Sequence, residues 1–284
     1  MRPQTLLVLA LSCALAAPAV AQTGTLEKIR RDGAITLGYI NDAAPFSFAD
    51  AKGEPQGYSV DLCREIARGI GTQLGLAKLD TRWVALTIQS RLEAVSSRRV
   101  DIECSTTTWT LGRQKNVDFS LITFVDGGSV LTAAASGLGR LADLGGKRVA
   151  VIKGTTTEQR LRASLARYAP NAEVLTVSTR PEGIKLVEDA KVDGFAADRT
   201  TLVGAVLSRP GGKAYRLLDE DFSIEPYVFT LPSGDHEYRL AVNRVLARLF
   251  RTGEIAKVYE RWLGPLGPPS ALLSATYFVQ GISE

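Results

Sequence analysis

Residues 100–108, with the sequence Val-Asp-Ile-Glu-Cys-Ser-Thr-Thr-Thr, carry the clearest indication of the architecture. The first five predict a short strand, and the polar run Ser105–Thr108 follows directly, with Arg113 close behind. Hydroxyls and free N–H groups at the carboxyl end of a strand lie where open α/β sheets bind ligands. The planar fork of arginine donors also matches a carboxylate. Taken alone, a threonine-rich loop with a solvated arginine is the simpler interpretation.

A similar unit begins again at Lys147. Residues 148–152 predict a strand, and Gly154 then precedes a helix that Thr155 and Glu158 open as a capping box. A glycine turn before a helix N-terminus favours an anion. The spacing differs from that of a nucleotide P-loop, so nucleotide binding is not indicated. A plain helix cap has the same geometry and stays open as the alternative.

The rest of the chain alternates short strands with amphipathic helices, which favours an α/β architecture with largely parallel sheets. Ser59 is expected to cap the first long helix. Asp198 ends a strand, where its carboxylate either receives an ammonium group or caps the next helix. Further strands are expected at 34–39, 174–177 and 192–197, and helices at 242–250 and 255–263. Because no flexible linker separates the two α/β units, we expect two lobes connected by crossing strands.

Two further groups of side chains are candidates for a site. Tyr39, Phe46 and Phe48 suit an apolar wall over a ligand, although each type is more often a core residue. Arg91, in Gln89-Ser90-Arg91, stands at the start of an expected helix. Its alternative interpretation is a surface helix residue.

The composition excludes several classes of protein. The chain has 284 residues, 45% of them hydrophobic and 23% charged, which is an ordinary globular balance. The net charge of +4 is scattered, whereas nucleic-acid binding needs a concentrated basic stripe, so it is not expected. A single histidine, His236, argues against histidine metal sites and a Ser-His-Asp triad. Without zinc, haem or dinucleotide motifs, we expect no metal, no cofactor and no catalytic residue.

The N-terminus predicts export. Arg2 precedes the apolar stretch Leu6–Ala17, and Ala19-Val20-Ala21 completes a secretory signal peptide cut after Ala21. The apolar stretch is too short to span a bilayer comfortably. Cys13 lies inside it without a convincing lipobox.

Two cysteines, Cys63 and Cys104, remain in the mature chain. In an oxidising compartment they either pair, which adds about 2–4 kcal/mol of stability, or stay as two separate buried thiols. The sequence does not favour the disulfide over the two separate thiols.

Taken together, the segments resemble the periplasmic amino-acid-binding proteins of ABC transporters, the bacterial solute-binding family 3 for polar amino acids. The resemblance covers almost the whole mature chain. Gln89-Ser90-Arg91 and Glu103-Cys104 bring it nearest to the glutamate/aspartate-binding branch. The matching segments are 33–38, 45–48, 57–62, 101–108 with Arg113, 117–120, 154–156 and Asp198.

The resemblance implies a two-lobed type II periplasmic binding protein fold, with the ligand cleft between the lobes. Residues 1–21 would be the signal peptide, and residues 22–127 plus 223–264 would form lobe 1. Residues 128–222 would form lobe 2. Apart from the resemblance, Pro265, Pro268 and Pro269 predict an irregular tail over residues 265–284, which either packs on a lobe or is loose.

The resemblance also implies a ligand site. Arg113 would hold the α-carboxylate of an amino acid with help from Thr108 and Thr106. Thr155 and Thr156 would donate to the same ligand from the second lobe, and Asp198 would take the α-ammonium group. A zwitterion loses its water when the lobes close, so each charge needs a fixed partner.

The positions that would recognise the ligand side chain match the family less completely than those for its α-amino and α-carboxylate groups. Arg91 matches the position that reaches an acidic side chain, and Arg180 falls where the branch often has a histidine. Ile40 stands where a basic residue is often found. One charged hydrogen bond is worth about 1.5–3 kcal/mol, so its loss either weakens glutamate binding or redirects the pocket to glutamine or another polar amino acid.

The expected function is therefore an exported, monomeric receptor that captures glutamate or aspartate by lobe closure and delivers it to a membrane ABC permease. Two alternatives belong to other classes. A cyclohexadienyl dehydratase-like enzyme on the same fold would need Glu103 or Asp198 as its acid. A sensory domain is disfavoured because no transmembrane helix follows the second lobe.

Overall fold

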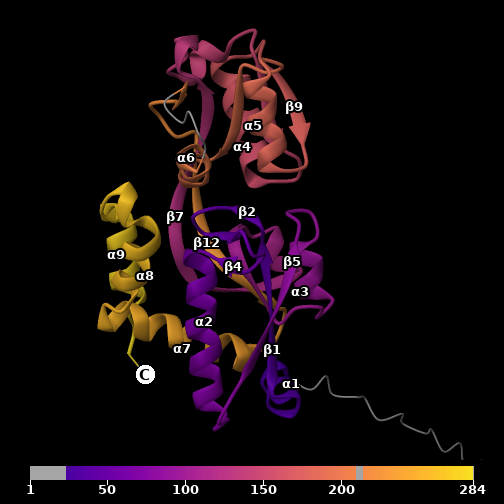
Figure 1. The fold of residues 1–284 in the computed structure, drawn as a ribbon, viewed down its shortest axis with the longest axis vertical. Helices are drawn as coiled ribbons and strands as arrows, with labels where there is room; N and C mark the ends of the chain where they lie inside the picture. Colours follow the sequence, from indigo (N-terminus) through magenta and orange to yellow (C-terminus); the bar gives the residue numbers. More distant parts are fainter. Residues whose placement is uncertain (1–23, 209–213, 284) are drawn as a thin grey trace, which may run out of the picture.

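The computed structural model describes residues 24–208 and 214–283. They form two α/β lobes that two long strands, β7 (Val117–Ala133) and β12 (Ser223–Pro232), join (Figure 1). The predicted signal peptide and Cys13 lie outside the described residues. Within the described ranges, no helix is both long and apolar enough to cross a membrane.

One sheet runs through both lobes in the order β5-β1-β6-β12-β7-β10-β8-β9, and β11 also pairs with β7. In lobe 1, β5, β1 and β6 are parallel, while β12 runs antiparallel to both β6 and β7. In lobe 2, β10, β8 and β9 are parallel. The expected largely parallel sheets are therefore interrupted by the two antiparallel crossing strands.

Lobe 1 has a large apolar core in which strand residues such as Leu37 and Phe229 meet helix residues such as Ile66 and Leu246, and a smaller apolar cluster that includes Ile40. A small sheet of three short strands lies at its cleft end. The strands are β1 (Ala34–Ile40), β2 (Asp42–Ala43), β3 (Ser47–Ala49), β4 (Pro55–Gln56), β5 (Asp80–Leu86) and β6 (Ile102–Thr108). The helices are α1 (Thr25–Asp32), α2 (Tyr58–Gln73), α3 (Arg91–Ser96), α7 (His236–Thr252), α8 (Ile255–Leu263) and α9 (Ala271–Gln280).

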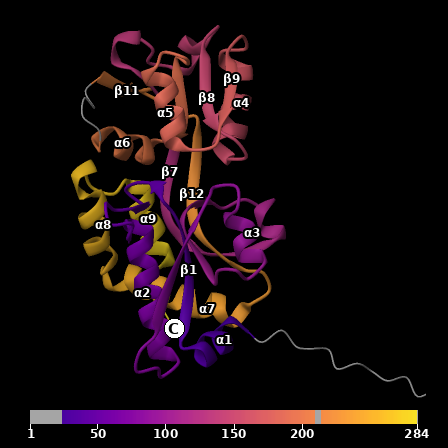
Figure 2. The same ribbon diagram turned by 45° about the vertical axis from the view of Figure 1, so that its right-hand side comes forward.

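Lobe 2 has apolar cores on both faces of its sheet. Val149 and Val151 enter one core, and their neighbours Ala150 and Ile152 enter the other, as side-chain alternation along a strand requires. Its strands are β8 (Arg148–Ile152), β9 (Glu173–Val177), β10 (Gly194–Asp198) and β11 (Tyr215–Leu217). Its helices are α4 (Thr156–Tyr168), α5 (Arg180–Glu188) and α6 (Arg199–Leu207), which Figure 2 shows above the crossing strands.

The expected cap of the first long helix is wrong. Helix α2 starts at Tyr58 after Gly57, and Ser59 lies inside it, where its hydroxyl donates to the Ser105 carbonyl at 2.9 Å. Gly57 has φ of 124°, and a Cβ there would lie 2.3 Å from the Phe46 carbonyl oxygen. The helix therefore begins at a position that only glycine suits.

The polar run after residue 104 is not a loop. Strand β6 continues to Thr108, and the whole of Ser105–Thr108 is buried. β1 pairs with the start of this strand, at residues 102 and 103, and β12 pairs with its end, at residues 107 and 108. The hydroxyls are therefore held by a strand in the middle of the sheet.

Of the aromatic residues near the start of the chain, Tyr39 and Phe46 are buried in the core, and Phe48 is partly buried. Phe46 is fully buried and packs edge-on against Tyr58, Phe124 and Tyr227. Tyr39 and Phe48 likewise contact tryptophans of lobe 1, and none of the three predicted wall residues lines the interlobe cleft.

The irregular tail predicted after residue 264 is wrong, since it contains helix α9. Ser270 caps this helix by accepting from the Leu273 N–H at 3.2 Å. Tyr277 is buried and donates to the Thr123 carbonyl at 3.0 Å, which ties α9 to β7. The prolines before Ser270 are confined to the connection.

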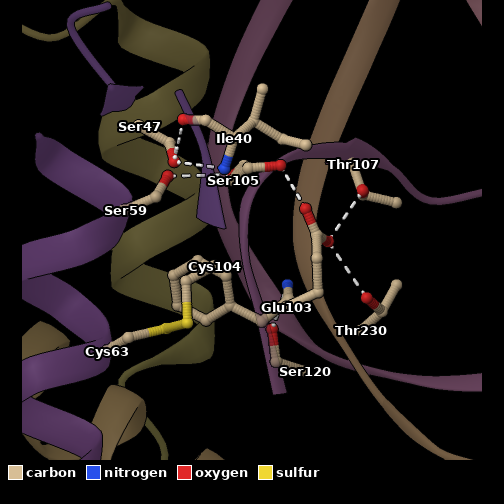
Figure 3. The surroundings of a disulfide bond; sticks show 11 residues. Ile40, Ser47, Ser59, Cys63, Glu103, Cys104, Ser105, Thr107, Ser120 and Thr230 are labelled. Atoms are coloured by element: carbon tan, nitrogen blue, oxygen red, sulfur yellow. Dashed lines mark hydrogen bonds between the residues drawn. A yellow bond between two sulfur atoms is a disulfide. The ribbon is translucent and has the colours of Figure 1, made fainter. Parts of the chain in front are cut away.

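Cys63 and Cys104 form a disulfide that links α2 to β6 (Figure 3). Both residues are fully buried in the lobe 1 core. Beside the bond, Glu103 accepts hydrogen bonds from Ser105, Thr107 and Thr230, which satisfies a carboxylate buried inside the sheet.

Candidate ligand-binding cleft

The cleft between the lobes holds an empty volume of about 340 Å³, part of it open to solvent. Seven of the eight predicted ligand-binding residues line it, namely Arg91, Thr106, Thr108, Thr155, Thr156, Arg180 and Asp198. Residues from β6 and α3 of lobe 1 thus face residues from the ends of β8 and β10 of lobe 2.

Arg113, the eighth residue, lies beside the cleft. Its Nη1 donates to the Thr108 carbonyl at 2.8 Å, which fixes the guanidinium next to the threonine that lines the cleft. Burial, and secondly the charge of Arg91, lower the pKa of Arg113 to about 10. The side chain therefore stays positively charged at neutral pH.

Glu225 joins hydroxyls from the two lobes. Its Oε2 accepts from Thr108 Oγ1 at 2.7 Å and from Thr156 Oγ1 at 2.8 Å, and its Oε1 accepts from Ser223 Oγ at 2.7 Å. Sequence reasoning missed Glu225 as a site residue. The available signal was one carboxylate directly before the apolar run Pro226–Leu231.

Asp198 is held from two sides at the end of β10. Its Oδ1 accepts from Thr157 Oγ1 at 2.9 Å, and its Oδ2 accepts from the Tyr227 hydroxyl at 2.6 Å. Asp198 occupies the N-cap position of α6, but its side chain makes no capping hydrogen bond. The carboxylate is thus directed to the cleft side and not to the helix.

A second buried carboxylate shares the same tyrosine. Asp126 Oδ2 lies 3.1 Å from the Tyr227 hydroxyl, and Asp126 also accepts from the Gly127 N–H and from the N–H and hydroxyl of Thr200. Burial, followed by the charge of Asp198, raises the pKa of Asp126 to about 7. Neither Asp126 nor Tyr227 was expected from sequence, because their proximity depends on pairing between β7 and β12.

Arg91 is a buried cation without a protein partner. Its side chain makes no hydrogen bond or ion pair within the described part of the chain, and its buried Nε has no acceptor. Burial lowers its pKa, an effect that the charge of Glu103 opposes. Because a buried charge is costly without a counter-charge, this guanidinium suits an anionic group in the cleft.

Arg180 has a partner that sequence reasoning did not foresee. Its Nη1 forms an ion pair with Asp42 Oδ1 at 3.0 Å, and its backbone N–H donates to Asp42 Oδ2 at 3.2 Å. Asp42 belongs to lobe 1 and Arg180 to lobe 2, so this pair crosses the cleft. The Nε of Arg180 is buried without an acceptor.

The isoleucine expected to replace a basic ligand contact lies elsewhere. Ile40 is buried in an apolar cluster of lobe 1, and Ile88 is the residue of that lobe that lines the cleft with an apolar side chain. Ile88 also packs against an apolar cluster of lobe 2.

The second-lobe turn has the expected cap in modified form. Thr155 Oγ1 accepts from the Glu158 N–H at 3.0 Å, whereas the Glu158 carboxylate reaches Gly154 N–H instead of that of Thr155. The first turn of α4 thus faces the cleft with N–H groups that the helix itself does not use.

The two lobes are in contact across the cleft. Thr156 Oγ1 lies 3.2 Å from Thr108 Oγ1, and Gln89 Nε2 donates to the Ser178 carbonyl at 3.4 Å. Together with the Asp42–Arg180 pair, these contacts define a closed arrangement. No cluster of carboxylate, histidine or cysteine side chains suited to a metal ion occurs in residues 24–208 or 214–283.

Comparison with known proteins places this geometry in a family. The chain is 31% identical over 273 residues to the L-glutamate/L-aspartate-binding protein of Pseudomonas aeruginosa, covering 95% of this chain and 90% of that protein. It is 28% identical over 275 residues to the glutamate/aspartate import solute-binding protein of Escherichia coli, covering 95% and 91%. Both relatives are named as binding proteins and not as enzymes.

A solved structure agrees with this assignment. The fold matches an ancestral amino acid-binding protein, described as a precursor of cyclohexadienyl dehydratase, with a TM-score of 0.72 and 28% identity. The match covers 84% of this chain and 99% of that one. A family model describing bacterial extracellular solute-binding proteins, family 3, matches residues 35–265. The chain therefore belongs to the family 3 bacterial extracellular solute-binding proteins.

Proposed function

We propose that this protein captures an acidic amino acid, glutamate or aspartate, in the cleft between its lobes. The observation that carries the proposal is Arg91, a buried guanidinium that lines the cleft and forms no hydrogen bond or ion pair with the residues that the structure describes. A ligand carboxylate at this position removes the cost of the unpaired charge.

The α-amino and α-carboxylate groups of the ligand are assigned to the other end of the cleft. Asp198 takes the ammonium group, and Arg113 with Thr106 and Thr108 holds the α-carboxylate. Thr155 and Thr156 add N–H donors from the start of α4 in lobe 2. What supports this assignment is that hydrogen bonds to other protein groups orient Asp198 and Arg113.

Lobe closure is assigned to the crossing strands. We take residues 22–127 and 223–264 as one rigid body and residues 128–222 as the other, with the hinge near Gly127 and Gly128. Each glycine lies against a neighbour, since a Cβ at Gly128 would lie 2.5 Å from Ser223 Oγ. The absence of a side chain lets β7 and β12 approach closely where the lobes join.

Export and delivery complete the proposal. Cleavage after Ala21 would release the mature protein as a monomer into the periplasm, where the closed form delivers its ligand to an ABC permease. What supports this part is that the Escherichia coli relative is named as a glutamate/aspartate import solute-binding protein.

The test is calorimetric titration of the mature protein, stripped of retained ligand by unfolding and refolding, with L-glutamate, L-aspartate, L-glutamine and L-asparagine. We expect the two acidic amino acids to bind more tightly than the two amides. Retained ligand must be removed because a site filled at a hundredfold its Kd adds about 2.7 kcal/mol of stability.

An Arg91→Met variant supplies the matched control. Methionine keeps much of the apolar stem and removes the charge, so we expect glutamate affinity to fall by about ten- to a hundredfold, the value of a charged hydrogen bond, while ligand-free stability is kept or raised. Binding of none of the four amino acids by the wild-type protein would contradict the proposal. Preference for the amides would redirect it to glutamine or asparagine.

A further inference from the structure

Asp42 acts on the cleft without lining it. From strand β2 of lobe 1, its carboxylate binds both the guanidinium and the backbone N–H of Arg180, at 3.0 and 3.2 Å. Arg180 is the first residue of α5, so the same carboxylate also satisfies an N–H group at that helix N-terminus. The Arg180 side chain is 7% exposed and that of Asp42 is 17% exposed, so solvent screens the pair little.

Arg180 and Arg91 both line the cleft, and they are close enough for the charge of Arg180 to act on Arg91. Burial is the main cause of the lowered pKa of Arg91, and the charge of Arg180 lowers that pKa further, while the charges of Glu103 and Asp198 raise it. The apolar side chain of Ile88 lines the cleft with them and packs against an apolar cluster of lobe 2. Two guanidiniums in such a setting repel each other unless a counter-charge is present.

The two arginines differ in whether a protein carboxylate pairs with them. Arg180 carries its own carboxylate partner, whereas Arg91 has none among the described residues. We propose that Asp42 is a specificity-determining residue, whose carboxylate neutralises Arg180 so that the ligand side chain meets one uncompensated guanidinium instead of two. This inference rests on the proposed function, since it concerns which amino-acid side chains the site accepts.

The consequence is a limit on discrimination between an acid and its amide. One uncompensated guanidinium favours a carboxylate over a carboxamide, and a second would favour it more strongly. Asp42 therefore keeps the ratio of glutamine Kd to glutamate Kd lower than the arginines alone would set it.

A set of four proteins separates this role from a structural one. Wild type, Asp42→Asn, Arg180→Gln and the double variant are titrated with L-glutamate and L-glutamine. We expect Asp42→Asn to raise the ratio of glutamine Kd to glutamate Kd by about tenfold, the value of one charge-assisted hydrogen bond. We expect Arg180→Gln to lower that ratio, because the carboxylate of Asp42 is then unpaired beside the ligand.

The double variant decides between the explanations. Because it removes both charges of the pair, its ratio should return close to that of the wild type. A purely structural contribution of the pair would weaken both ligands equally and leave the ratio unchanged in all four proteins, which would overturn the inference.

Two controls keep the outcome clear. Asp219→Asn removes the partner of Arg216 at the surface of lobe 2, in an exposed ion pair of the same 3.0 Å length, and should leave the ratio unchanged. If Asp42→Asn fails to fold, Asp42→Ser removes the same charge with a smaller side chain. A wild-type protein that binds no amino acid overturns the proposed function and this inference with it, whereas four equal ratios overturn the inference alone.

Discussion

Tyr227 lies between two buried carboxylates and has one hydroxyl proton to donate. Its oxygen is 2.6 Å from Asp198 and 3.1 Å from Asp126. If the hydroxyl donates to Asp198, the contact to Asp126 becomes a hydrogen bond only when Asp126 carries a proton of its own. The raised pKa of Asp126 agrees with this arrangement of protons.

Stability should consequently depend on pH through Asp126. The folded-state pKa of about 7 lies above the unfolded value of about 3.9, so the protonated acid is favoured by folding. This contribution is fully present below about pH 4 and is lost as pH rises through about 7. Asparagine resembles the protonated acid, because its amide donates to Tyr227 and its oxygen accepts from Gly127 and Thr200.

We therefore expect the difference in unfolding free energy between Asp126→Asn and wild type to grow in favour of the variant from pH 5 to pH 8. The change in that difference should be on the order of a few kcal/mol. Urea unfolding at both pH values measures it. Asp219→Asn, which removes an exposed carboxylate, controls for the change in net charge. An equal stability difference at the two pH values would contradict the assignment.

The placement of candidate residues in one cleft could be predicted from sequence where a local motif marks them. Arg91, Thr108 and Asp198 stand beside strand or helix ends that hydrophobic patterning marks, and the structure brings them to one cleft. Asp42 and Glu225 escaped notice because each acts across the lobe boundary. Their partners lie far away in the chain, and no spacing within a single element indicates such contacts.

Among the elements, β6 and α2 are joined by the disulfide, and β6 also carries Thr106 and Thr108 of the cleft. The bond ties Cys104, two residues before Thr106, to the middle of α2. Sequence left its formation open, since residue spacing does not give the separation of two cysteines in space.

A Cys63→Ala/Cys104→Ala variant should lose about 2–4 kcal/mol of unfolding free energy, because the unfolded chain then regains the freedom that the closed loop removed. Alanine is the suitable replacement, since serine would place an unpaired hydroxyl in the apolar core. Urea unfolding of this variant is compared with that of wild type and of wild type kept reduced by dithiothreitol. Equal midpoints for the oxidised wild type and the variant would disprove a stabilising role.

Helix α9 shows why the end of the chain was misread. Gly267, Pro268 and Pro269 are strong signals of irregular structure, and the ten residues after Ser270 show no pronounced polar face. The helix is stabilised by tertiary contacts, through Tyr277 to Thr123 and through Gln280 to the backbone of Ile122. Local sequence does not contain that information.

At the scale of the whole molecule, closure brings α6 against a loop of lobe 1. A Cβ on Gly204 would lie 2.6 Å from the Ala44 carbonyl oxygen and 2.9 Å from Pro45 Cδ. Gly204 is inside a helix, where glycine costs about 1 kcal/mol relative to alanine. Close contact between the lobes therefore accounts for a glycine that the helix itself disfavours.

Gly204→Ala should separate folding from closure. We expect thermal unfolding of the ligand-free protein to shift upward or stay unchanged, while affinity for the ligand falls by about tenfold because the closed form is obstructed. Small-angle scattering with saturating ligand should show a wider molecule than wild type. Ala205→Gly is the matched control, with lower stability and unchanged affinity, and a Gly204→Ala variant with wild-type affinity would contradict the argument.

The paired ends of lobe 2 have a consequence for biosynthesis. Gly128 on β7 pairs with Ser223 on β12, so the chain enters lobe 2 and leaves it at neighbouring positions. The core of lobe 1, by contrast, needs residues from Ile29 through Cys104 together with late ones such as Phe229 and Leu246. As the chain emerges from its N-terminus, lobe 2 has all its parts before lobe 1 does. The N-terminal part of lobe 1 then exposes its apolar surface until the C-terminal part has been made. We therefore expect a chaperone to bind the chain chiefly during this interval.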